Sequence, residues 1–288
     1  MSVAADNARI VTLAAAYLNG DPCAMKPAEV AEIARACGLT PEEAVPPVLA
    51  ALWGLDVDLP DDRRLYRVYF PQMLRRLDPA LVEADPYLRA VGFPQAREGA
   101  IALERMTYAP MELFVADDFR TDAQERIYPQ LGWFDRAVDY PALTEDGRIW
   151  MTVTPNEINT IRPCAEACRG RVLAYGLGLG YFAFHALLRP EVESVTVVER
   201  SPEVIALFRQ ALLPRFPRAD RLHIVQADAF DYADKDAPQG RFDVIFTDLW
   251  HDVSDGLPLY RRMKSLEFAG PKFLYWIAPT LRCYMEDA

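Results

Sequence analysis

The sequence has few of the residues that build metal centres or disulfide frameworks. Its 288 residues include five cysteines, an odd number, and only three histidines. No paired CxxC clusters with zinc spacing occur. Cys164 and Cys168 stand four positions apart and could share a helix face, but we expect two small core residues there and no metal site. Reduced thiols in a cytoplasmic protein are the simplest interpretation.

An excess of positive charge and a long apolar run are also missing. The net charge is −11, and such a surface repels polyphosphate, so we expect no nucleic-acid partner. No segment approaches the ~18 apolar residues that cross a bilayer. Asp6, Asn7 and Arg9 interrupt the N-terminal apolar residues, which a signal peptide would not allow. The expectation is a cytoplasmic protein with no membrane partner.

The first half of the chain is predicted to contain a helical module, residues 1–60, and an irregular α+β segment, residues 61–145. Apolar residues recur at helical spacing in the module. A helix-turn-helix is a weaker interpretation, because glutamates outnumber basic residues there and Pro46 and Pro47 should break its second helix. We expect a packing or dimerisation module, and with it a possible homodimer.

The irregular segment is rich in prolines and aromatic residues, and we expect it to shape a substrate pocket or a lid. RRLYRVYF (63–70) and IYPQLGWF (127–134) are strand candidates. Glu145, Asp146 and Gly147 predict a turn before a strand at 148–154.

From residue 146 to 288, apolar strands alternate with helices. Strands are predicted at 171–176, 194–199, 222–228, 242–248 and 272–278, with helices at 181–188 and 202–213. This alternation is typical of a mostly parallel sheet covered on both faces. The predicted fold class is therefore α/β, a Rossmann-like doubly wound sheet after an N-terminal helical module. A ligand would bind beyond the carboxyl ends of the strands.

Three glycines follow the first of these strands directly and precede a helix. Gly176, Gly178 and Gly180 form GxGxG in the context where such turns bind nucleotides. Glycine lets the backbone approach a ligand closely, and a helix N-terminus supplies free N–H groups. A dinucleotide site would want another glycine where Tyr181 stands, which disfavours NAD or FAD. A turn that only reverses the chain is the second alternative.

Acidic residues end the second and third strands of the series. Glu199 could accept the ribose hydroxyls of an adenosyl group; the alternative is a helix cap or a surface acid. Asp228 could accept a hydrogen bond from an adenine amino group, with Ala229 beside it. The alternative for Asp228 is a cap for the helix that follows.

Asp248 ends the fourth strand and opens the segment DLWHD. We predict that Asp248 binds a substrate amine or acts as a general base, with His251 as its helper. Trp250 and Asp252 are candidates for substrate contact, since an indole offers a face to cations. His251 could instead be a loop residue that packs on Trp250.

Together, the segments RVLAYGLGLGYFAFHAL, VTVVERSPEVI, HIVQADAF and FDVIFTDLW resemble class I S-adenosylmethionine-dependent methyltransferases, and among them the spermidine-synthase-like branch. The resemblance covers residues 148–280. It implies that S-adenosylmethionine is the cofactor and that the glycine turn holds its methionine part. It also implies contacts of Glu199 with ribose, of Asp228 with adenine and of Asp248 with the substrate.

Departures from that family limit the assignment. Leu179 stands where aminopropyltransferases have the acid of GGGDGG, which disfavours polyamine synthesis. Only 40 residues follow Asp248, too few for the usual sixth and seventh strands, so the strand at 148–154 or a partner chain could cover that edge. The family also implies that Asn156 and Glu157 can line the pocket, although a capped helix start explains them equally well.

The predicted function is methyl transfer from S-adenosylmethionine to a small polar or amine-bearing acceptor. Transfer from a sulfonium needs mainly alignment and a dry pocket, which suits a chain with few obvious catalytic residues. Two alternatives stay open. One is aminopropyl transfer from the decarboxylated cofactor, and the other is a non-enzymatic cofactor-binding or sensor protein.

Overall fold

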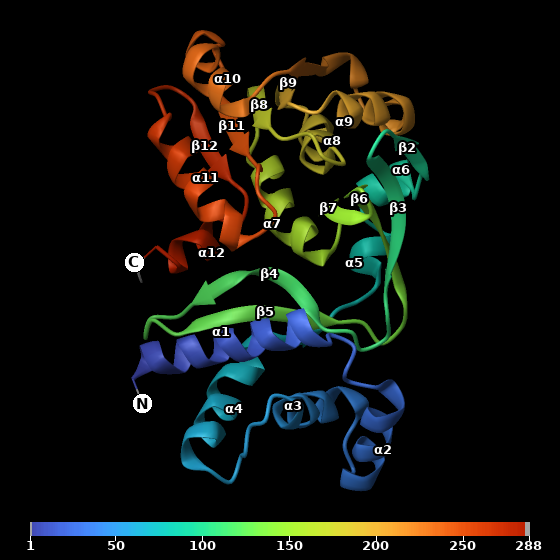
Figure 1. The fold of residues 1–288 in the computed structure, drawn as a ribbon, viewed down its shortest axis with the longest axis vertical. Helices are drawn as coiled ribbons and strands as arrows, with labels where there is room; N and C mark the ends of the chain where they lie inside the picture. The colour runs from blue at the N-terminus through green and yellow to red at the C-terminus, as the bar shows by residue number, and fades with distance from the viewer. Residues whose placement is uncertain (1, 286–288) are drawn as a thin grey trace. The chain divides into compact units, whose positions relative to one another are not determined.

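The computed structural model describes residues 2–285. It divides into two compact units, one formed by Met1–Leu81 and Thr107–Asp139 and the other by Val82–Met106 and Tyr140–Ala288. Figure 1 labels the helices and strands of both units. The three-part division at residues 60 and 145 stays a prediction.

The first unit packs four helices against a small sheet. Its helices are α1 (Val3–Gly20), α2 (Pro27–Cys37), α3 (Pro41–Leu52) and α4 (Pro60–Met73). The sheet has the order β1 (Leu74–Arg76), β5 (Ile127–Trp133), β4 (Phe114–Thr121). One cluster of buried apolar side chains from all four helices and from β5 forms the core. The strand predicted at 127–134 is confirmed as β5.

Two predictions for this unit are wrong. Residues 63–70 belong to helix α4 and not to a strand, because the buried side chains Leu65, Tyr69 and Met73 recur every four residues. Helix α3 continues through Pro46 and Pro47. Glu42 and Glu43, four positions before the prolines, are exposed. Water can therefore bond the two carbonyls that lose their N–H donors.

The second unit contains a parallel sheet of five strands. Their order is β10 (Leu222–Gln226), β9 (Val192–Glu199), β8 (Gly170–Tyr175), β11 (Val244–Thr247), β12 (Lys272–Tyr275). All four neighbouring pairs are parallel. The chain order reverses between β8 and β11, so the crevice for a ligand lies beyond the carboxyl ends of these two strands. The predicted Rossmann-like fold is confirmed.

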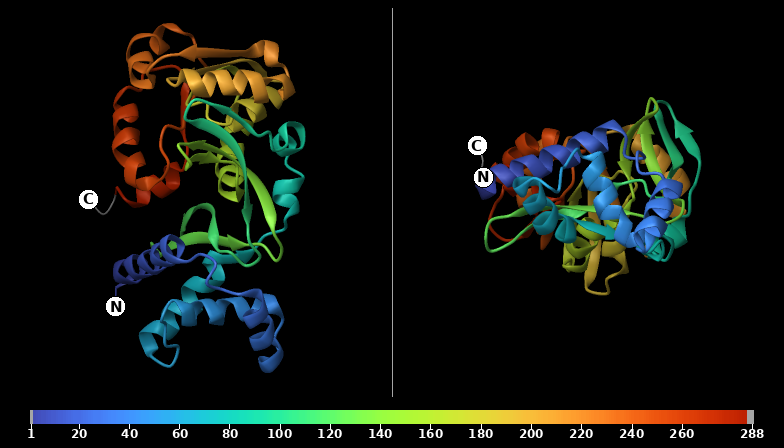
Figure 2. Two further views of the ribbon diagram at one scale, coloured as in Figure 1. Left: turned by 45° about the vertical axis from the view of Figure 1, so that its right-hand side comes forward. Right: turned by 90° about the horizontal axis from the view of Figure 1, so that it is seen from below.

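Helices cover both faces of this sheet. On one face lie α7 (Pro155–Glu166), α8 (Tyr181–Leu188) and α9 (Pro202–Leu207), and on the other lie α10 (Ala229–Lys235) and α11 (Val253–Ser265); Figure 2 shows α11 and the yellow helix α8 on opposite sides. A π-helical turn, Phe208–Leu212, extends α9. Short 3₁₀ turns at Leu213–Arg215, Ala219–Arg221 and Ala237–Gln239 and helix α12 (Ala278–Cys283) complete the connections.

A second, four-stranded sheet precedes the parallel one in the chain. Its order is β2 (Ala96–Glu98), β3 (Ile101–Tyr108), β6 (Val138–Glu145), β7 (Arg148–Thr152), and α5 (Ala80–Glu83) and α6 (Pro86–Val91) come before it. Asp146 and Gly147 have positive φ angles of 49° and 77°, which confirms the predicted turn. The hairpin pairs β7 with β6, so the prediction that this strand covers the edge at β12 is wrong.

Within residues 2–285, no helix has the length and apolar character to cross a bilayer. In the same range, no three His, Cys, Asp or Glu side chains come together in a way that could hold a metal ion. The Cys168 thiol is buried and contacts the Cys164 carbonyl oxygen at 3.3 Å.

Candidate functional site

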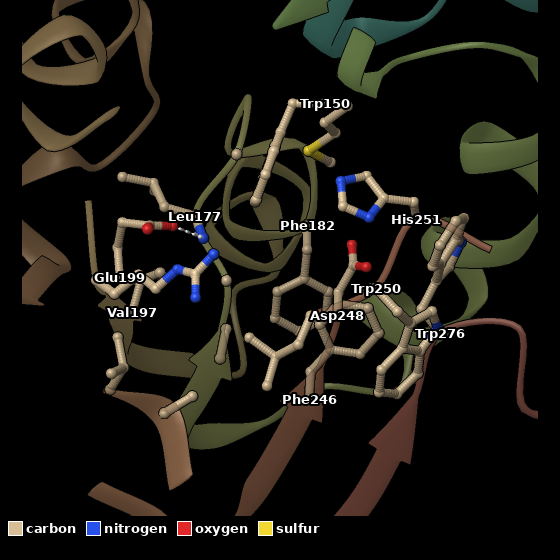
Figure 3. Close-up of a pocket in the computed structure, with 18 of the residues that line it drawn as sticks. Trp150, Leu177, Phe182, Val197, Glu199, Phe246, Asp248, Trp250, His251 and Trp276 are labelled. Atoms are coloured by element: carbon tan, nitrogen blue, oxygen red, sulfur yellow. Dashed lines mark hydrogen bonds between the residues drawn. The ribbon is translucent and has the colours of Figure 1, made fainter. Parts of the chain in front are cut away.

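A cavity of roughly 380 Å³ lies at the carboxyl ends of the parallel strands. Its wall comes from the glycine turn after β8, the ends of β9 and β10, the loop after β11, and strand β7. This volume is at the lower end of the range for small-molecule sites, about 300–1,000 Å³. Figure 3 shows Leu177 and Glu199 on one side and Asp248, His251, Trp250 and Trp276 on the other.

The glycine turn has a backbone that only glycine adopts easily. Gly176, Gly178 and Gly180 have φ angles of 95°, 47° and 75°. A Cβ at Gly176 would overlap the Asp248 carbonyl oxygen, and one at Gly178 would overlap the Met151 sulfur. Gly176 and Gly178 line the cavity, whereas Gly180 begins helix α8 and packs on Phe208.

Most backbone N–H groups of this turn already have acceptors. The Gly176 N–H donates to the Val198 carbonyl at 3.0 Å, and the Gly180 N–H donates to the Leu177 carbonyl at 2.7 Å. The Leu177 N–H donates to Glu199 Oε2 at 3.1 Å. The Leu179 N–H has only the Met151 thioether, at 3.3 Å, and sulfur is a weak acceptor.

Glu199 ends β9 and turns its carboxylate toward the glycine turn. Oε2 accepts from Leu177, and Oε1 accepts from the Ser201 N–H at 2.8 Å. Each carboxylate oxygen offers about two lone-pair sites. Glu199 is therefore fixed by the backbone and can still accept two further hydrogen bonds in the cavity, as a pair of ribose hydroxyls requires.

Asp228 and Ala229 line the cavity at the end of β10. Asp228 Oδ1 caps α10, since it accepts from the N–H groups of Phe230 at 2.9 Å and Asp231 at 3.1 Å. The sequence left open whether this residue is a cap or a ligand contact, and its position is compatible with both. Contact with adenine stays a prediction.

Asp248 lies on the opposite side of the cavity. Burial raises the pKa of its carboxyl to about 8, and the nearby Glu157 adds to the shift by charge repulsion. Among residues 2–285, no side chain or backbone donor bonds the Asp248 carboxylate. Glu157 lines the same cavity, and burial raises its pKa as well, although it accepts from the Thr154 N–H at 2.8 Å.

His251 lines the cavity but is bonded away from Asp248. Its Nδ1 lies 2.7 Å from Asp255 Oδ2, and its ring meets the Trp150 ring edge-on at 4.6 Å between centroids. Partial burial raises the pKa of Asp255, but the hydrogen bond with the His251 ring and those from the backbone N–H groups of Asp252 and His251 together lower it below its usual value. The aromatic partner of His251 is thus Trp150, not the Trp250 suggested by the sequence.

Aromatic side chains form the walls around Asp248. Trp250 and Trp276 are buried and line the cavity, and Phe182 stacks on Phe246 with 4.0 Å between ring centroids. The Trp276 indole N–H donates to Thr160 Oγ1 at 2.9 Å. Asp248 is half-buried, and these rings leave its carboxyl poorly hydrated, which is the main cause of its raised pKa.

Two predicted substrate contacts lie outside the cavity lining. Asp252 caps helix α11: its Oδ1 accepts from the Ser254 N–H at 2.6 Å. Asn156 sits in the first turn of α7, and its buried Oδ1 has no hydrogen-bond donor within the described residues. Asp252 is thus an N-cap, and Asn156 lies in the first turn of a helix that Thr154 and Glu157 cap, which is the alternative left open for that segment. Neither is brought together with Asp248.

Trp150, Met151 and Arg200 are among the lining residues that were not anticipated from the sequence. Trp150 and Met151 come from strand β7, and Arg200 follows Glu199. The Arg200 guanidinium lies 5.8 Å from the centre of the Trp150 ring. Strand β7 pairs with β6 in the four-stranded sheet, so no motif near Trp150 and Met151 in the sequence indicates that they line a cavity at the parallel sheet.

A buried cluster beneath the glycine turn was also missed. Asp85 forms an ion pair with Arg162, accepts from the Tyr181 hydroxyl at 2.9 Å and lies 3.6 Å from His185 Nε2. Burial opposes the charge of Asp85, but His185 and Tyr181 lower its pKa. Next to it, the Tyr87 hydroxyl donates to the Leu179 carbonyl at 2.6 Å, which fixes the glycine turn from below.

Comparisons with known proteins find partly similar solved structures but no matching sequence family. No family model matches the chain, and neither does any curated protein sequence. Among solved structures, spermidine synthase from Thermotoga maritima is 19% identical with a TM-score of 0.36; the match covers 52% of this chain and 59% of that one. The cofactor-bound protein Rv0187 from MTB is 25% identical with a TM-score of 0.31, over 40% of this chain and 52% of that one. This chain thus spans little more than half the length of either.

Proposed function

We propose that this protein is an S-adenosylmethionine-dependent transferase that passes a methyl group to a small polar or amine-bearing acceptor. One observation carries the proposal. The left-handed turn at Gly176 and Gly178, the carboxylate of Glu199 and the buried carboxyl of Asp248 all line one cavity at the switch point of the sheet. The resemblance of residues 148–280 to class I methyltransferases supports the same assignment.

The residues of the cavity suit an adenosyl sulfonium better than a dinucleotide. Gly176 and Gly178 line the cavity with backbone alone, so a ligand there can approach their backbone closely. Glu199 has lone pairs left for ribose hydroxyls, and Asp228 and Ala229 stand where adenine would bind. Five carboxylic acids line the cavity, and those that are ionised favour a cationic ligand and disfavour a pyrophosphate.

When bound, S-adenosylmethionine supplies a methyl group that is already activated on a sulfonium. The residues of this chain would align the acceptor and keep water out. Trp250 and Trp276 would wall the acceptor site. Asp248, with a pKa of about 8, would take a proton from an ammonium or hydroxyl acceptor in its ionised form, which predominates above about pH 8. The hydrogen bond of His251 Nδ1 with Asp255 and the contact with the Trp150 ring would orient the imidazole at the edge of the cavity.

Calorimetry with four ligands tests the cofactor class: S-adenosylmethionine, its decarboxylated form, methylthioadenosine and NAD. We expect binding of the adenosyl sulfur compounds and none of NAD. Binding of NAD alone, or of none of the four, would overturn the proposal. Release of S-adenosylhomocysteine with a panel of small amines then tests methyl transfer.

Aminopropyl transfer is a second candidate, and one contact favours it. The Leu179 N–H already has the Met151 sulfur as its acceptor, so a cofactor without a carboxylate could bind with that contact intact. Tighter binding of the decarboxylated cofactor and release of methylthioadenosine during turnover would select this candidate over methyl transfer. A sensor role would be selected if no acceptor gives turnover and cofactor changes the oligomeric state.

A further inference from the structure

Met151 occupies a part of the cavity wall that could hold a negatively charged ligand group. Near the ends of β9 and β10, Glu199 and Asp228 disfavour a carboxylate. At the turn that begins α8, by contrast, backbone N–H groups and the helix dipole attract anions. The Met151 sulfur covers that turn: it lies against Gly178 and accepts from the Leu179 N–H at 3.3 Å.

The contact is one that a ligand can displace. A thioether is a weak acceptor, whereas a carboxylate makes charge-assisted hydrogen bonds to N–H groups that are roughly twice as strong as neutral ones. Methionine is unbranched and has several rotatable bonds, so its side chain can leave the turn without movement of strand β7. The other N–H groups of the turn with assigned partners have oxygen acceptors that would not yield.

We propose that Met151 is a specificity-determining residue that selects against adenosyl ligands with a carboxylate. This inference rests on the proposed adenosyl-binding function. A ligand with an amino-acid tail, such as S-adenosylmethionine, binds only after Met151 leaves the Leu179 N–H. Methylthioadenosine and the decarboxylated cofactor have no carboxylate and bind with Met151 in place. The side chain of Met151 therefore sets the affinity ratio between the two ligand classes.

Substitution of Met151 tests this ratio. In Met151→Ala, we expect the affinity for S-adenosylmethionine to rise by about fivefold or more, while that for methylthioadenosine changes less than about twofold. Met151→Leu is the matched control, since it keeps the bulk and removes the acceptor; S-adenosylmethionine should gain little there. Calorimetry of both ligands with the three full-length proteins gives the ratio, and thermal unfolding shows that each variant is folded.

A spectroscopic measurement checks the movement independently. With ¹³C-methyl methionine labelling, the Met151 signal, identified by its loss in Met151→Leu, should shift strongly with S-adenosylmethionine and little with methylthioadenosine. Equal shifts for the two ligands would contradict the proposal, whatever the affinities.

Other outcomes separate this inference from the proposed function. If the wild-type protein binds neither ligand, both fail. If it binds methylthioadenosine but Met151→Ala alters both affinities equally, only the role of Met151 fails. Arg200 is the cation on the cavity wall that could compete for a carboxylate. If Arg200→Gln weakens S-adenosylmethionine selectively while Met151→Ala has no effect, the carboxylate binds Arg200 and the inference is overturned.

Discussion

The two sides of the cavity hold the same kind of residue in opposite surroundings. Glu199 and Asp248 are both acids that follow parallel strands. Glu199 accepts two backbone hydrogen bonds. Asp248 has aromatic walls, a second buried carboxyl nearby and a pKa of about 8. Acids at the ends of parallel strands can therefore differ in function. Backbone N–H donors hold Glu199 in position to bind a ligand. Asp248 lacks such donors, and its raised pKa suits it to proton exchange.

The largest predicted effect is on the rate of transfer, and it comes from substitution of Asp248, whose carboxylate accepts no hydrogen bond from the described residues. We expect Asp248→Asn to lower the rate of transfer by about 100-fold or more and to leave the Kd of the cofactor within about twofold. Steady-state kinetics with the acceptor found by screening, together with calorimetry, measures both. Asp252→Asn is the matched control, because Asn also caps a helix and Asp252 is outside the cavity lining. Loss of cofactor binding in Asp248→Asn would show that Asp248 contacts the cofactor and not the acceptor.

Gly176 links the two sides, since its Cα faces the carbonyl of Asp248. In Gly176→Ala the new methyl group overlaps that carbonyl at a φ of 95°. We expect a loss of about 2–4 kcal/mol in the free energy of unfolding, measured by chemical denaturation. Gly147→Ala has a similar positive φ, but a Cβ there has open space. A loss as large in Gly147→Ala would show that backbone strain alone, and not the contact with Asp248, causes the effect.

On the binding side, Glu199→Ala should weaken S-adenosylmethionine by about tenfold or more, since it removes charge-assisted hydrogen bonds of ~1.5–3 kcal/mol. Calorimetry measures the change. The control is Glu193→Ala, which removes an exposed acid from the same strand. Unchanged affinity in Glu199→Ala would exclude Glu199 from the ribose contact. The proposed difference in function between Glu199 and Asp248 would then be wrong.

The smallest effect concerns stability against pH. An unfolded Asp loses its proton near pH 4, whereas folded Asp248 keeps it until about pH 8. The folded state therefore binds more protons between these values, and stability falls as pH rises through this window. Asp248→Asn removes this loss, so its stability relative to the wild type should increase from pH 4 to pH 8, by about 1–2 kcal/mol after allowance for water in the cavity. Denaturation at several pH values measures the difference, and a constant difference would contradict the raised pKa.

The sequence predicted the parallel sheet well because its signals are local. The strand at 171–176, the helix at 181–188 and the glycine turn between them lie within about two residues of β8 and α8. Each is bounded by its own residues: apolar runs, glycines and caps. Pairing in this sheet follows from the right-handed crossover of successive βαβ units.

The same approach failed where tertiary packing decides the structure. RRLYRVYF contains strand-forming aromatics, yet burial of Tyr69 and Phe70 against β5 makes it helix α4. Trp150 and Met151 reach the cavity from a hairpin of another sheet, and Tyr87 reaches the glycine turn across 92 positions of the sequence. Such contacts have no local pattern, so half of the proposed site was invisible to periodicity and motifs.

The π-helical turn Phe208–Leu212 has a consequence for how this fold tolerates change. Phe208 packs directly beneath Gly180. A π-helical turn holds one residue more than an α-helical turn. Deletion of a single residue between Phe208 and Leu212 would restore regular helix but rotate one side of it by about 100°. The number of residues in that helix therefore determines which side chain packs against Gly180, and with it the position of the turn at which a cofactor would bind.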